Sequence, residues 1–336
     1  MSKVISMFLF SVMAIISILV VKLFPDIHGT TLWIMVDSSV LSVIPFLQES
    51  LKSLKQKSWF TGVPIYFLAQ YSGTFLILSG VVLSTMASVK GSFGVWCMCA
   101  GFGLKLGLFP FNFWVNLSFI NFHYLGVFIA GTAQKIFMIF AVPFLTTDPI
   151  CGDALYLMSL MSMLWGAFGM LMSIEVKPFL GYMSLNYTGC LTLCADHDII
   201  MACQYAGGYS LTVFFLSLIL SQSNCRYLSD LSSKMPLYYK AGFFFLAFSI
   251  SGFPPFMEFS VKYAMISLLW STGFHFTVYL IMVANVMMMM AWLSMFPFTT
   301  ANIFKPLEFS GSVNQNILNI ICIIWSIFSG FSFGML

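Results

Sequence analysis

Four ionisable residues lie inside apolar stretches of a 336-residue chain in which only 7% of the residues are charged. Asp37 and Lys135 fall near the centres of two of these stretches. Lys105 lies inside a third, and Lys262 directly follows a Gly-Pro interruption in a fourth. An ionisable side chain at the centre of a bilayer costs roughly 2.5 to 3.5 kcal/mol on insertion scales, so such residues are retained for a function. We interpret the four residues as candidate sites on a proton or ion pathway.

Lysine chemistry suits proton transfer in such a place. An apolar environment disfavours the charged ammonium form, whereas a nearby carboxylate favours it, so movement of the carboxylate loads or unloads the proton. We expect Asp37 and Lys105 to form such a pair from neighbouring helices. Lys135 is then the next acceptor, and Lys262 is the exit site or the site on the far side.

Other kinds of chemistry find no support in the sequence. We see no phosphate-binding loop, no nucleophile arrangement and no cluster of redox ligands. The eight cysteines have no C-x-x-C spacing and no nearby histidine, so we interpret them as small buried hydrophobic residues. The formal net charge of +3 is small and scattered, which does not suggest a nucleic-acid partner. We therefore expect this chain to bind no metal and no cofactor.

The elements that must position the four residues are membrane helices. Hydrophobic residues make up 60% of the chain and aromatic residues 18%, a composition typical of integral membrane proteins. Polar and Pro/Gly punctuation divides the chain into eleven apolar segments, most of them near the 20 residues that span a bilayer. The segments cover residues 4–24, 29–47, 59–86, 91–121, 122–145, 153–173, 176–195, 199–221, 236–270, 274–296 and 315–335. We thus predict an all-α polytopic protein with about eleven transmembrane helices.

The positions of the basic residues support this count. With eleven spans, nine basic residues fall on the side of the N-terminus, and only Lys22 and Lys90 fall on the other side. The nine are Lys3, Lys52, Lys55, Lys57, Lys177, Arg226, Lys234, Lys240 and Lys305. Because Lys and Arg accumulate in loops that stay on the matrix or cytoplasmic side, the N-terminus is predicted to lie on that side.

The fourth and ninth segments are too long for straight single spans, and they share a motif. GLFPFNFW at 107–114 and GFPPFMEF at 252–259 both read Gly-x-x-Pro-Phe, with an aromatic residue seven positions after the glycine. We predict broken helices at these two places, with Gly107 and Pro110 in the first break and Gly252, Pro254 and Pro255 in the second.

The matching breaks predict an internal repeat. Residues 1–146 and 147–297 would each form a five-helix unit, and residues 298–336 would add a loop and a C-terminal helix. Since five is odd, the second unit enters the membrane from the opposite face, which is the inverted-repeat architecture of secondary transporters.

Four stretches also carry a resemblance to a known family. They are KLGLFPFNFWV at 105–115, AQKIF at 133–137, KPFLGYMSLNYTG at 177–189 and SGFPPFMEFSVKY at 251–263. In this order and at this spacing they resemble the subunit 2 family of mitochondrial NADH:ubiquinone oxidoreductase (respiratory complex I), an antiporter-like family of its membrane arm. The resemblance covers nearly the whole chain.

The resemblance implies roles for single residues. Lys105, Lys135 and Lys262 stand where the family has its membrane lysines. Asp37 stands eight residues before Pro45, where the family has a glutamate. Asn112 and Tyr187 replace two family histidines; we take both as candidate helpers of the relay, together with Glu258, which follows the second break.

The resemblance also implies a setting. The chain would translocate protons in the mitochondrial inner membrane, driven by NADH oxidation and quinone reduction in other subunits. FMN, iron–sulfur clusters and ubiquinone would be bound by those subunits. Its partners would be other membrane-arm subunits, including neighbouring antiporter-like ones, and membrane lipids.

Two alternatives remain open at the level of the sequence. A stand-alone or Mrp-type cation/proton antiporter would share the repeat and the lysines. A purely structural membrane spacer would keep the charges for packing alone, and its lysines would be dispensable for pumping.

Overall fold

The computed structural model describes residues 62–86, 91–146, 148–223, 225–233, 235–254, 256–295, 297 and 313–334. The first two predicted spans and Asp37 lie outside these residues, as does Pro255. The findings below concern the described part of the chain.

Helices account for all the extended regular elements of this part, which confirms the predicted all-α class for it; one isolated bridge pairs Glu175 with Tyr227. The elements are α3 (Gly62–Met86), α4 (Gly91–Leu106), α5 (Phe113–Phe119), α6 (Tyr124–Phe128), the π-helix η1 (Ile129–Ala133), α7 (Gln134–Ile139), α8 (Val142–Leu145), α9 (Pro149–Met172), α10 (Val176–His197), α11 (Ile199–Ser223), α12 (Asp230–Ser233), α13 (Leu237–Ser251), α14 (Met257–Ser271), α15 (His275–Leu293) and α17 (Val313–Gly334).

Several of these helices are suited to lipid. Four of the described helices are long and apolar enough to cross a membrane, namely most of α3 (Gly62–Ser84) and the whole of α9, α11 and α15. Large apolar side chains also point outward along them, with Leu68 70% exposed, Phe75 71% and Phe276 73%. Water would disfavour so much exposed apolar surface, whereas acyl chains cover it without cost. The chain is a membrane protein.

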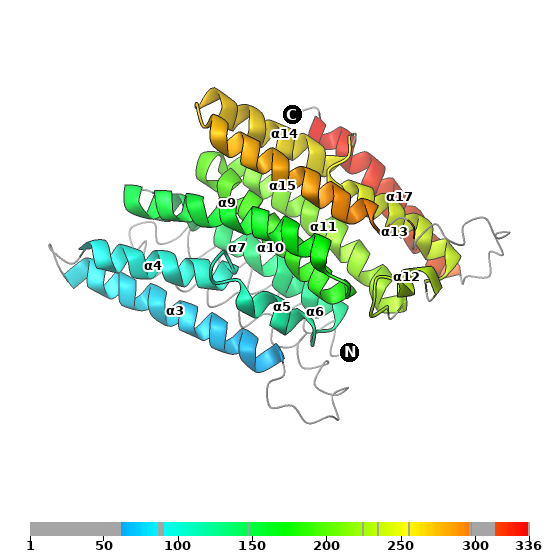
Figure 1. Cartoon of the computed structure of the whole chain (residues 1–336), viewed down its shortest axis with the longest axis horizontal. Coiled ribbons are helices and arrows are strands. Elements are labelled where there is room, and N and C mark those ends of the chain that lie inside the picture. Colours follow the sequence, from blue (N-terminus) through cyan, green and yellow to red (C-terminus); the bar gives the residue numbers. More distant parts are fainter. Residues whose placement is uncertain are drawn as a thin grey trace. The chain divides into compact units, whose positions relative to one another are not determined.

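The chain consists of two compact units, and the first contains α3 to α8. It comprises the residues up to Met163 together with Ser184–Cys203. Helices α3 and α4 run side by side and α3 also contacts α5 (Figure 1). Glycines let the α3 and α4 backbones approach closely: a Cβ at Gly101 of α4 would lie 2.8 Å from the carbonyl oxygen of Gly73 on α3. Small residues play this part in membrane-helix packing.

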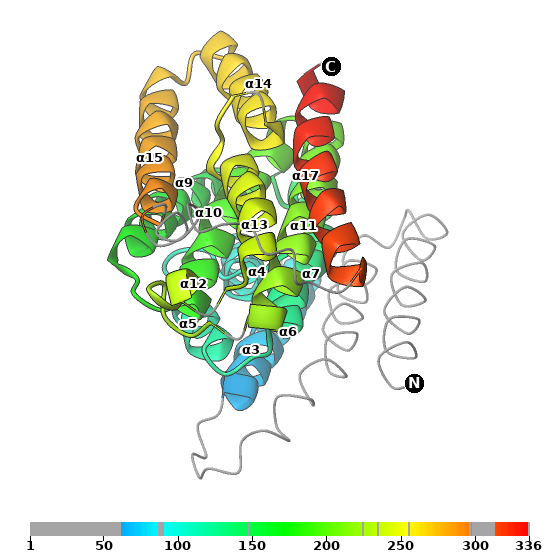
Figure 2. The same ribbon diagram turned by 90° about the vertical axis from the view of Figure 1, so that its right-hand side faces the viewer.

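The second unit comprises Leu164–Met183 and the residues from Gln204 onward. In it α17 packs along α13 and α14, and α15 contacts both α13 and α14 (Figure 2). Trp292 of α15 is 1% exposed and meets the ring of Phe179 edge-on at a centroid distance of 5.0 Å. This unit carries the second predicted helix break.

Both predicted breaks are present. The fourth predicted segment is divided into α4 and α5, with residues 107–112 between them, and the ninth is divided into α13 and α14, with residues 252–256 between them. The fifth predicted segment, 122–145, is also interrupted, which the sequence did not lead us to expect. Its π-helix η1 contains Gly131 and Thr132, and the Thr132 hydroxyl donates to the carbonyl of Phe128. Such side-chain bonding to the preceding turn bends helices.

One cysteine pair departs from the expectation that all eight are isolated hydrophobic residues. Cys99 of α4 and Cys151 of α9 form a disulfide, with their Cα atoms 6.0 Å apart. The two residues are 52 positions apart, and no local spacing signals the pairing. Among the other cysteines, Cys97 and Cys203 are only partly buried, whereas Cys190 and Cys194 are buried as expected.

The close approach of α3 and α4 generates a prediction. Gly101→Ala places a methyl group against the Gly73 carbonyl and the Ile77 backbone, so the helices must separate. We expect the substitution to destabilise the fold by about 1–3 kcal/mol, the usual cost of overpacking. A lower midpoint of thermal unfolding of the detergent-solubilised protein measures this. The control is Gly207→Ala in α11, where no atom lies within 4 Å of an added Cβ; equal midpoints for both variants would contradict the packing argument.

Candidate functional site

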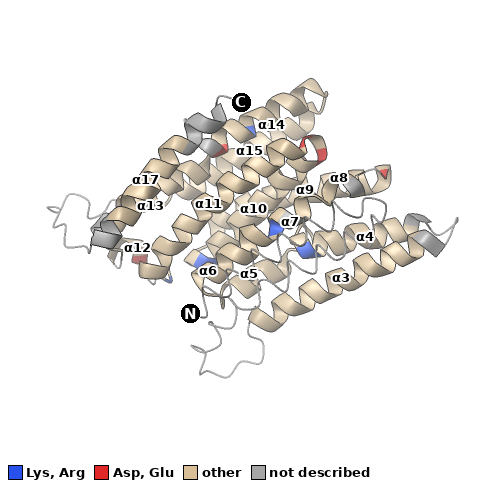
Figure 3. Ribbon diagram, turned by 180° about the vertical axis from the view of Figure 1, so that it is seen from behind, with Lys and Arg blue, Asp and Glu red and all other residues tan. Residues whose placement is uncertain are grey.

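The three lysines that the sequence predicts as membrane sites are all buried. Lys105 lies in the last turn of α4, Lys135 is the second residue of α7, and Lys262 lies in α14. Their exposed fractions are 2%, 2% and 4%. Charged residues are sparse on the described ribbon (Figure 3), and Lys240 and Glu258 are buried as well, at 3% and 2% exposed. None of the three reaches the surface by extending its side chain.

A left-handed glycine forms the first break. Gly107 ends α4 with φ +73°, a conformation that is disfavoured for residues with a Cβ atom. The amide of Leu108 donates to the carbonyl of Gly103 at 2.8 Å, and the amide of Gly107 donates to that of Leu104 at 3.3 Å. These are the two bonds of a Schellman cap. The chain then turns through a cis bond between Phe109 and Pro110 into α5.

Two polar side chains satisfy carbonyls left at this break. The indole of Trp114 donates to the Leu104 carbonyl at 2.8 Å. The side-chain amide of Gln70 on α3 donates to the Lys105 carbonyl at 3.4 Å. Unsatisfied carbonyls at membrane depth cost several kcal/mol, so these bonds make the break tolerable.

Gln70 belongs to a buried chain of hydrogen bonds that sequence reasoning missed. The Tyr66 hydroxyl donates to Gln134 Oε1 at 2.7 Å, and Gln134 Nε2 donates to Gln70 Oε1 at 3.3 Å. All three side chains are at most 2% exposed. Gln134 directly precedes Lys135, so this chain connects the end of the Lys105 helix to the start of the Lys135 helix. The available signal was two amide side chains within apolar segments, where polar groups need partners.

Lys135 has a backbone partner. Its Nζ donates to the carbonyl of Ser184 on α10 at 3.2 Å, and the same carbonyl accepts from the Thr188 hydroxyl at 2.9 Å. The lysine follows the π-helix η1 immediately. Interruptions of this kind recur at functional sites because they redirect side chains and free backbone groups. Tyr187, a candidate helper, is also buried on α10, three residues after Ser184.

The second break resembles the first in its use of glycine. Gly252 caps α13 with φ +82° and an added Cβ would lie 4.0 Å from Nζ of Lys262, so the cap directly faces the lysine. Pro254 is exposed, and α14 starts at Met257 after an extended Phe256. The predicted proximity of a lysine to each break therefore holds for both units.

The second unit brings Glu258 and Lys262 together. Nζ of Lys262 lies 2.9 Å from Oε2 of Glu258, and the two side chains are 5% and 3% exposed. The hydroxyl of Tyr205 on α11 donates to Oε1 of Glu258 at 3.1 Å. Lys262 also approaches Sδ of Met288 on α15 at 3.4 Å. Tyr205 was not predicted, because nothing local to QYAGGYS distinguishes it from a core tyrosine.

A cavity opens beside this ion pair. It measures about 370 Å³ and is lined by Lys262, Ser251 and Gly252 at its polar end. Asn285 of α15 also lines it, and its buried Oδ1 has no hydrogen-bond partner among the described residues. Apolar residues such as Ile266 and Met282 complete the walls. Two other residues of the lining, Tyr263 and Val286, are exposed, so the cavity opens to the surface of the unit.

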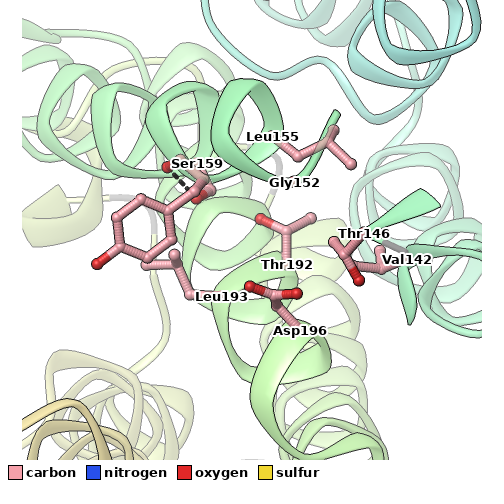
Figure 4. A pocket seen from close by; sticks show the side chains of 9 residues that line it. Val142, Thr146, Gly152, Leu155, Ser159, Thr192, Leu193 and Asp196 are labelled. Atoms are coloured by element: carbon pink, nitrogen blue, oxygen red, sulfur yellow. Dashed lines mark hydrogen bonds between the residues drawn. The ribbon is translucent and has the colours of Figure 1, made fainter. Parts of the chain in front are cut away.

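A much smaller cavity lies in the first unit. Figure 4 shows Thr192 and Asp196 of α10 near Val142 and Thr146 of the α8 segment, where they line a space of about 10 Å³ together with Ser159 of α9. That space is about the size of one water molecule. It is too small for an organic ligand.

The remaining predicted helper, Asn112, lies at the start of α5. It is 9% exposed and makes no capping bond with its side chain. Its buried Nδ2 has no hydrogen-bond partner among the described residues. Within the same part of the chain, no group of three or more His, Cys, Asp or Glu residues is arranged to hold a metal ion.

The glutamine chain generates a prediction. Gln134→Leu leaves the Tyr66 hydroxyl and Gln70 Oε1 without the partners seen here, at a cost of about 1–3 kcal/mol for each stranded group. We expect a lower midpoint of thermal unfolding. Adding Tyr66→Phe removes one stranded group and should restore part of the loss. A midpoint unchanged by Gln134→Leu alone would show that these hydrogen bonds do not support the first unit.

Comparisons with known proteins identify the family of the chain. Curated relatives named NADH-ubiquinone oxidoreductase chain 2 include those of Rhynchonycteris naso, 25% identical over 249 residues, and of Genetta servalina, 27% identical over 254 residues. Each alignment covers 71% of this chain and 70% of the relative.

Solved structures share the fold. Respiratory complex I from Thermus thermophilus contains a chain that matches with a TM-score of 0.72 at 18% identity, covering 96% of this chain and 78% of that one. The Mrp complex from Dietzia sp. DQ12-45-1b matches with a TM-score of 0.68 at 11% identity, covering 99% and 91%. Residues 60–288 match the family described as NADH:quinone oxidoreductase/Mrp antiporter, transmembrane. This chain belongs to that family of antiporter-like membrane subunits.

Proposed function

We propose that this chain is an antiporter-like, proton-translocating subunit of the membrane arm of a respiratory complex I. The observation that carries the proposal is that each of three buried lysines lies beside an interruption of its helix. Lys105 and Lys262 lie at glycine-capped breaks, and Lys135 follows a π-helix. A buried cation beside free backbone groups is the arrangement expected of a site that gains and loses a proton.

The energy for translocation would come from other subunits. The curated relatives carry the name NADH-ubiquinone oxidoreductase chain 2, and that enzyme oxidises NADH and reduces quinone. In our proposal this chain performs no redox chemistry and binds no cofactor. FMN, iron–sulfur clusters and ubiquinone belong to other subunits, and neighbouring antiporter-like subunits and lipids contact its apolar flanks.

The proposed architecture is the full inverted repeat. Residues 1–146 and 147–297 form the two five-helix units, and residues 298–336 add a loop and the eleventh helix. The matching glycine caps at Gly107 and Gly252 support this symmetry, since each ends a helix just before a Pro-containing turn. The excess of Lys and Arg supports an N-terminus on the matrix side of the mitochondrial inner membrane.

The proposed relay begins with Asp37 and Lys105, continues through Lys135 and ends at Lys262. Lys135 is bonded to a backbone carbonyl, which accepts from an ammonium group but does not bind its proton covalently. The carbonyl thus favours the protonated lysine, and the proposed transfer requires water or another acceptor to reach Lys135. Asn112 does not titrate, so any connection at that position requires water, and Tyr187 is a hydroxyl connector.

An Mrp-type cation/proton antiporter is the second candidate. The Mrp structure supports it, since it covers nearly all of this chain at a TM-score of 0.68. The first candidate is favoured by the curated relatives, which are named NADH-ubiquinone oxidoreductase chain 2 and are 25% and 27% identical to this chain, against 11% for the Mrp chain. Purification of the native complex discriminates the two, because only a complex I carries redox subunits. A structural spacer is excluded if neutralising a lysine abolishes pumping without loss of assembly.

We expect Asp37→Asn and Lys105→Ala each to lower the number of protons translocated per electron, because each removes one half of the loading pair. The measurement is the proton-to-electron ratio of the assembled enzyme in sealed vesicles, with NADH oxidation recorded in parallel. The matched control is Glu175→Gln, which removes a carboxylate paired with the exposed Arg226. Normal assembly with an unchanged proton-to-electron ratio in both Asp37→Asn and Lys105→Ala would refute the proposal.

A further inference from the structure

We infer that Glu258 is the proton-exchanging partner of Lys262 and that Tyr205 positions it, so that the second helix break carries a carboxylate–lysine switch of its own. This inference rests on the proposed function. It changes the role of Glu258 from a helper of the relay to a group that itself accepts and releases a proton. From the sequence we predicted such a carboxylate–lysine pair only for Asp37 and Lys105.

The geometry of the pair is fixed by one helix. Glu258 and Lys262 are four residues apart on α14, which places them on the same face. Their charged atoms are 2.9 Å apart, and both side chains are almost wholly buried. The hydrogen bonds of Lys262 Nζ in the described part of the chain go to this carboxylate and to the weak acceptor Met288 Sδ. Glu258 is thus the strongest proton acceptor in contact with the lysine.

Tyr205 orients the carboxylate. Its hydroxyl lies 3.1 Å from Oε1 and 3.4 Å from Oε2, and it comes from α11, a different helix. The shorter bond engages Oε1 and leaves Oε2 directed at the lysine. Tyr205 is 1% exposed and its ring lies 6.0 Å from that of Tyr209, so packing holds the hydroxyl in place.

Stability alone does not account for this arrangement. A buried ion pair loses its hydration, at several kcal/mol per ion, and often contributes no more than an apolar pair of the same size would. Glu258 lies in the first turn of α14, where the helix dipole already favours a carboxylate. That dipole effect falls off within the first turn, so it does not account for Lys262, the sixth residue of α14.

We take the cavity beside Lys262 as the route by which protons reach the pair. Lys262 lines the cavity of about 370 Å³, and Ser251 and Asn285 place polar atoms beside it. In the proposed step the N–H bond of the ammonium breaks and an O–H bond forms at Oε2. The charged pair becomes a neutral amine and a neutral acid with no change in net charge. The acid then gives its proton to water and the amine accepts another proton from water in the cavity, which restores the charged pair.

The test compares four versions of the assembled enzyme: wild type, Glu258→Gln, Lys262→Gln and the double variant. Each single variant leaves one charge buried without its partner, and the double variant removes both. Assembly is measured as the amount of native complex, and function as the proton-to-electron ratio at matched NADH oxidation. The switch predicts the same lowered ratio in all three variants, with assembly better in the double variant than in either single variant.

A structural role and a proton-exchanging role of the Glu258–Lys262 pair predict different proton-to-electron ratios. If the pair were only structural, the double variant would recover the wild-type ratio, which overturns the inference. If Lys262→Gln lowers the ratio and Glu258→Gln does not, Glu258 is no partner and the inference fails while the proposed function stands. If Lys105→Ala and Lys262→Gln both assemble and pump normally, the proposed function itself fails.

The role of Tyr205 is tested by Tyr205→Phe, which keeps the ring and removes only the hydroxyl. We expect a ratio between those of wild type and Glu258→Gln, with assembly unchanged. The control is Tyr279→Phe on α15, where the side chain is 58% exposed. A wild-type ratio in Tyr205→Phe would show that the hydroxyl does not position the carboxylate.

Discussion

The structure depends on one constraint, which is that a polar group at membrane depth must find its partner inside the protein. Unbroken helices meet this requirement by themselves, whereas helix breaks do not. At the first break the Schellman bonds of Gly107, the indole of Trp114 and the amide of Gln70 bind carbonyls near the end of α4. These bonds allow the helix to end in the membrane and leave Lys105 at the break.

The same constraint explains how the buried cations are held, and the two units meet it differently. Lys135 donates to the carbonyl of Ser184, so its charge is solvated by a backbone dipole. Lys262 instead pairs with the carboxylate of Glu258, which Tyr205 binds from a second helix. The carbonyl favours the protonated lysine without being able to take its proton, whereas the carboxylate is able to take it. The two lysines therefore suit different steps of one proton path.

The sequence alone predicted the helical elements but not the contacts between residues that are distant in the chain, because the patterns used are local. Hydropathy and the Gly-x-x-Pro-Phe motif are local, so they correctly predicted the helical class and both breaks. They also found the three lysines, because a cation in an apolar segment is visible at once. Tyr205, the Gln70–Gln134 pair and the Cys99–Cys151 disulfide depend on packing between distant segments, and a buried tyrosine or glutamine looks the same with or without a partner. The interruption of segment 122–145 was missed because a π-helix needs neither glycine cap nor proline.

The central claim is that buried lysines at helix interruptions carry protons through this subunit. Lys135 tests it most directly, because its bond in the described residues is to a backbone carbonyl, and replacing it by Met breaks no ion pair there. The decisive measurement is the proton-to-electron ratio of the assembled enzyme carrying Lys135→Met, compared with Lys177→Met at the start of α10. We predict a lowered ratio for Lys135→Met alone, with NADH oxidation continuing. A wild-type ratio in a normally assembled Lys135→Met enzyme would contradict the account.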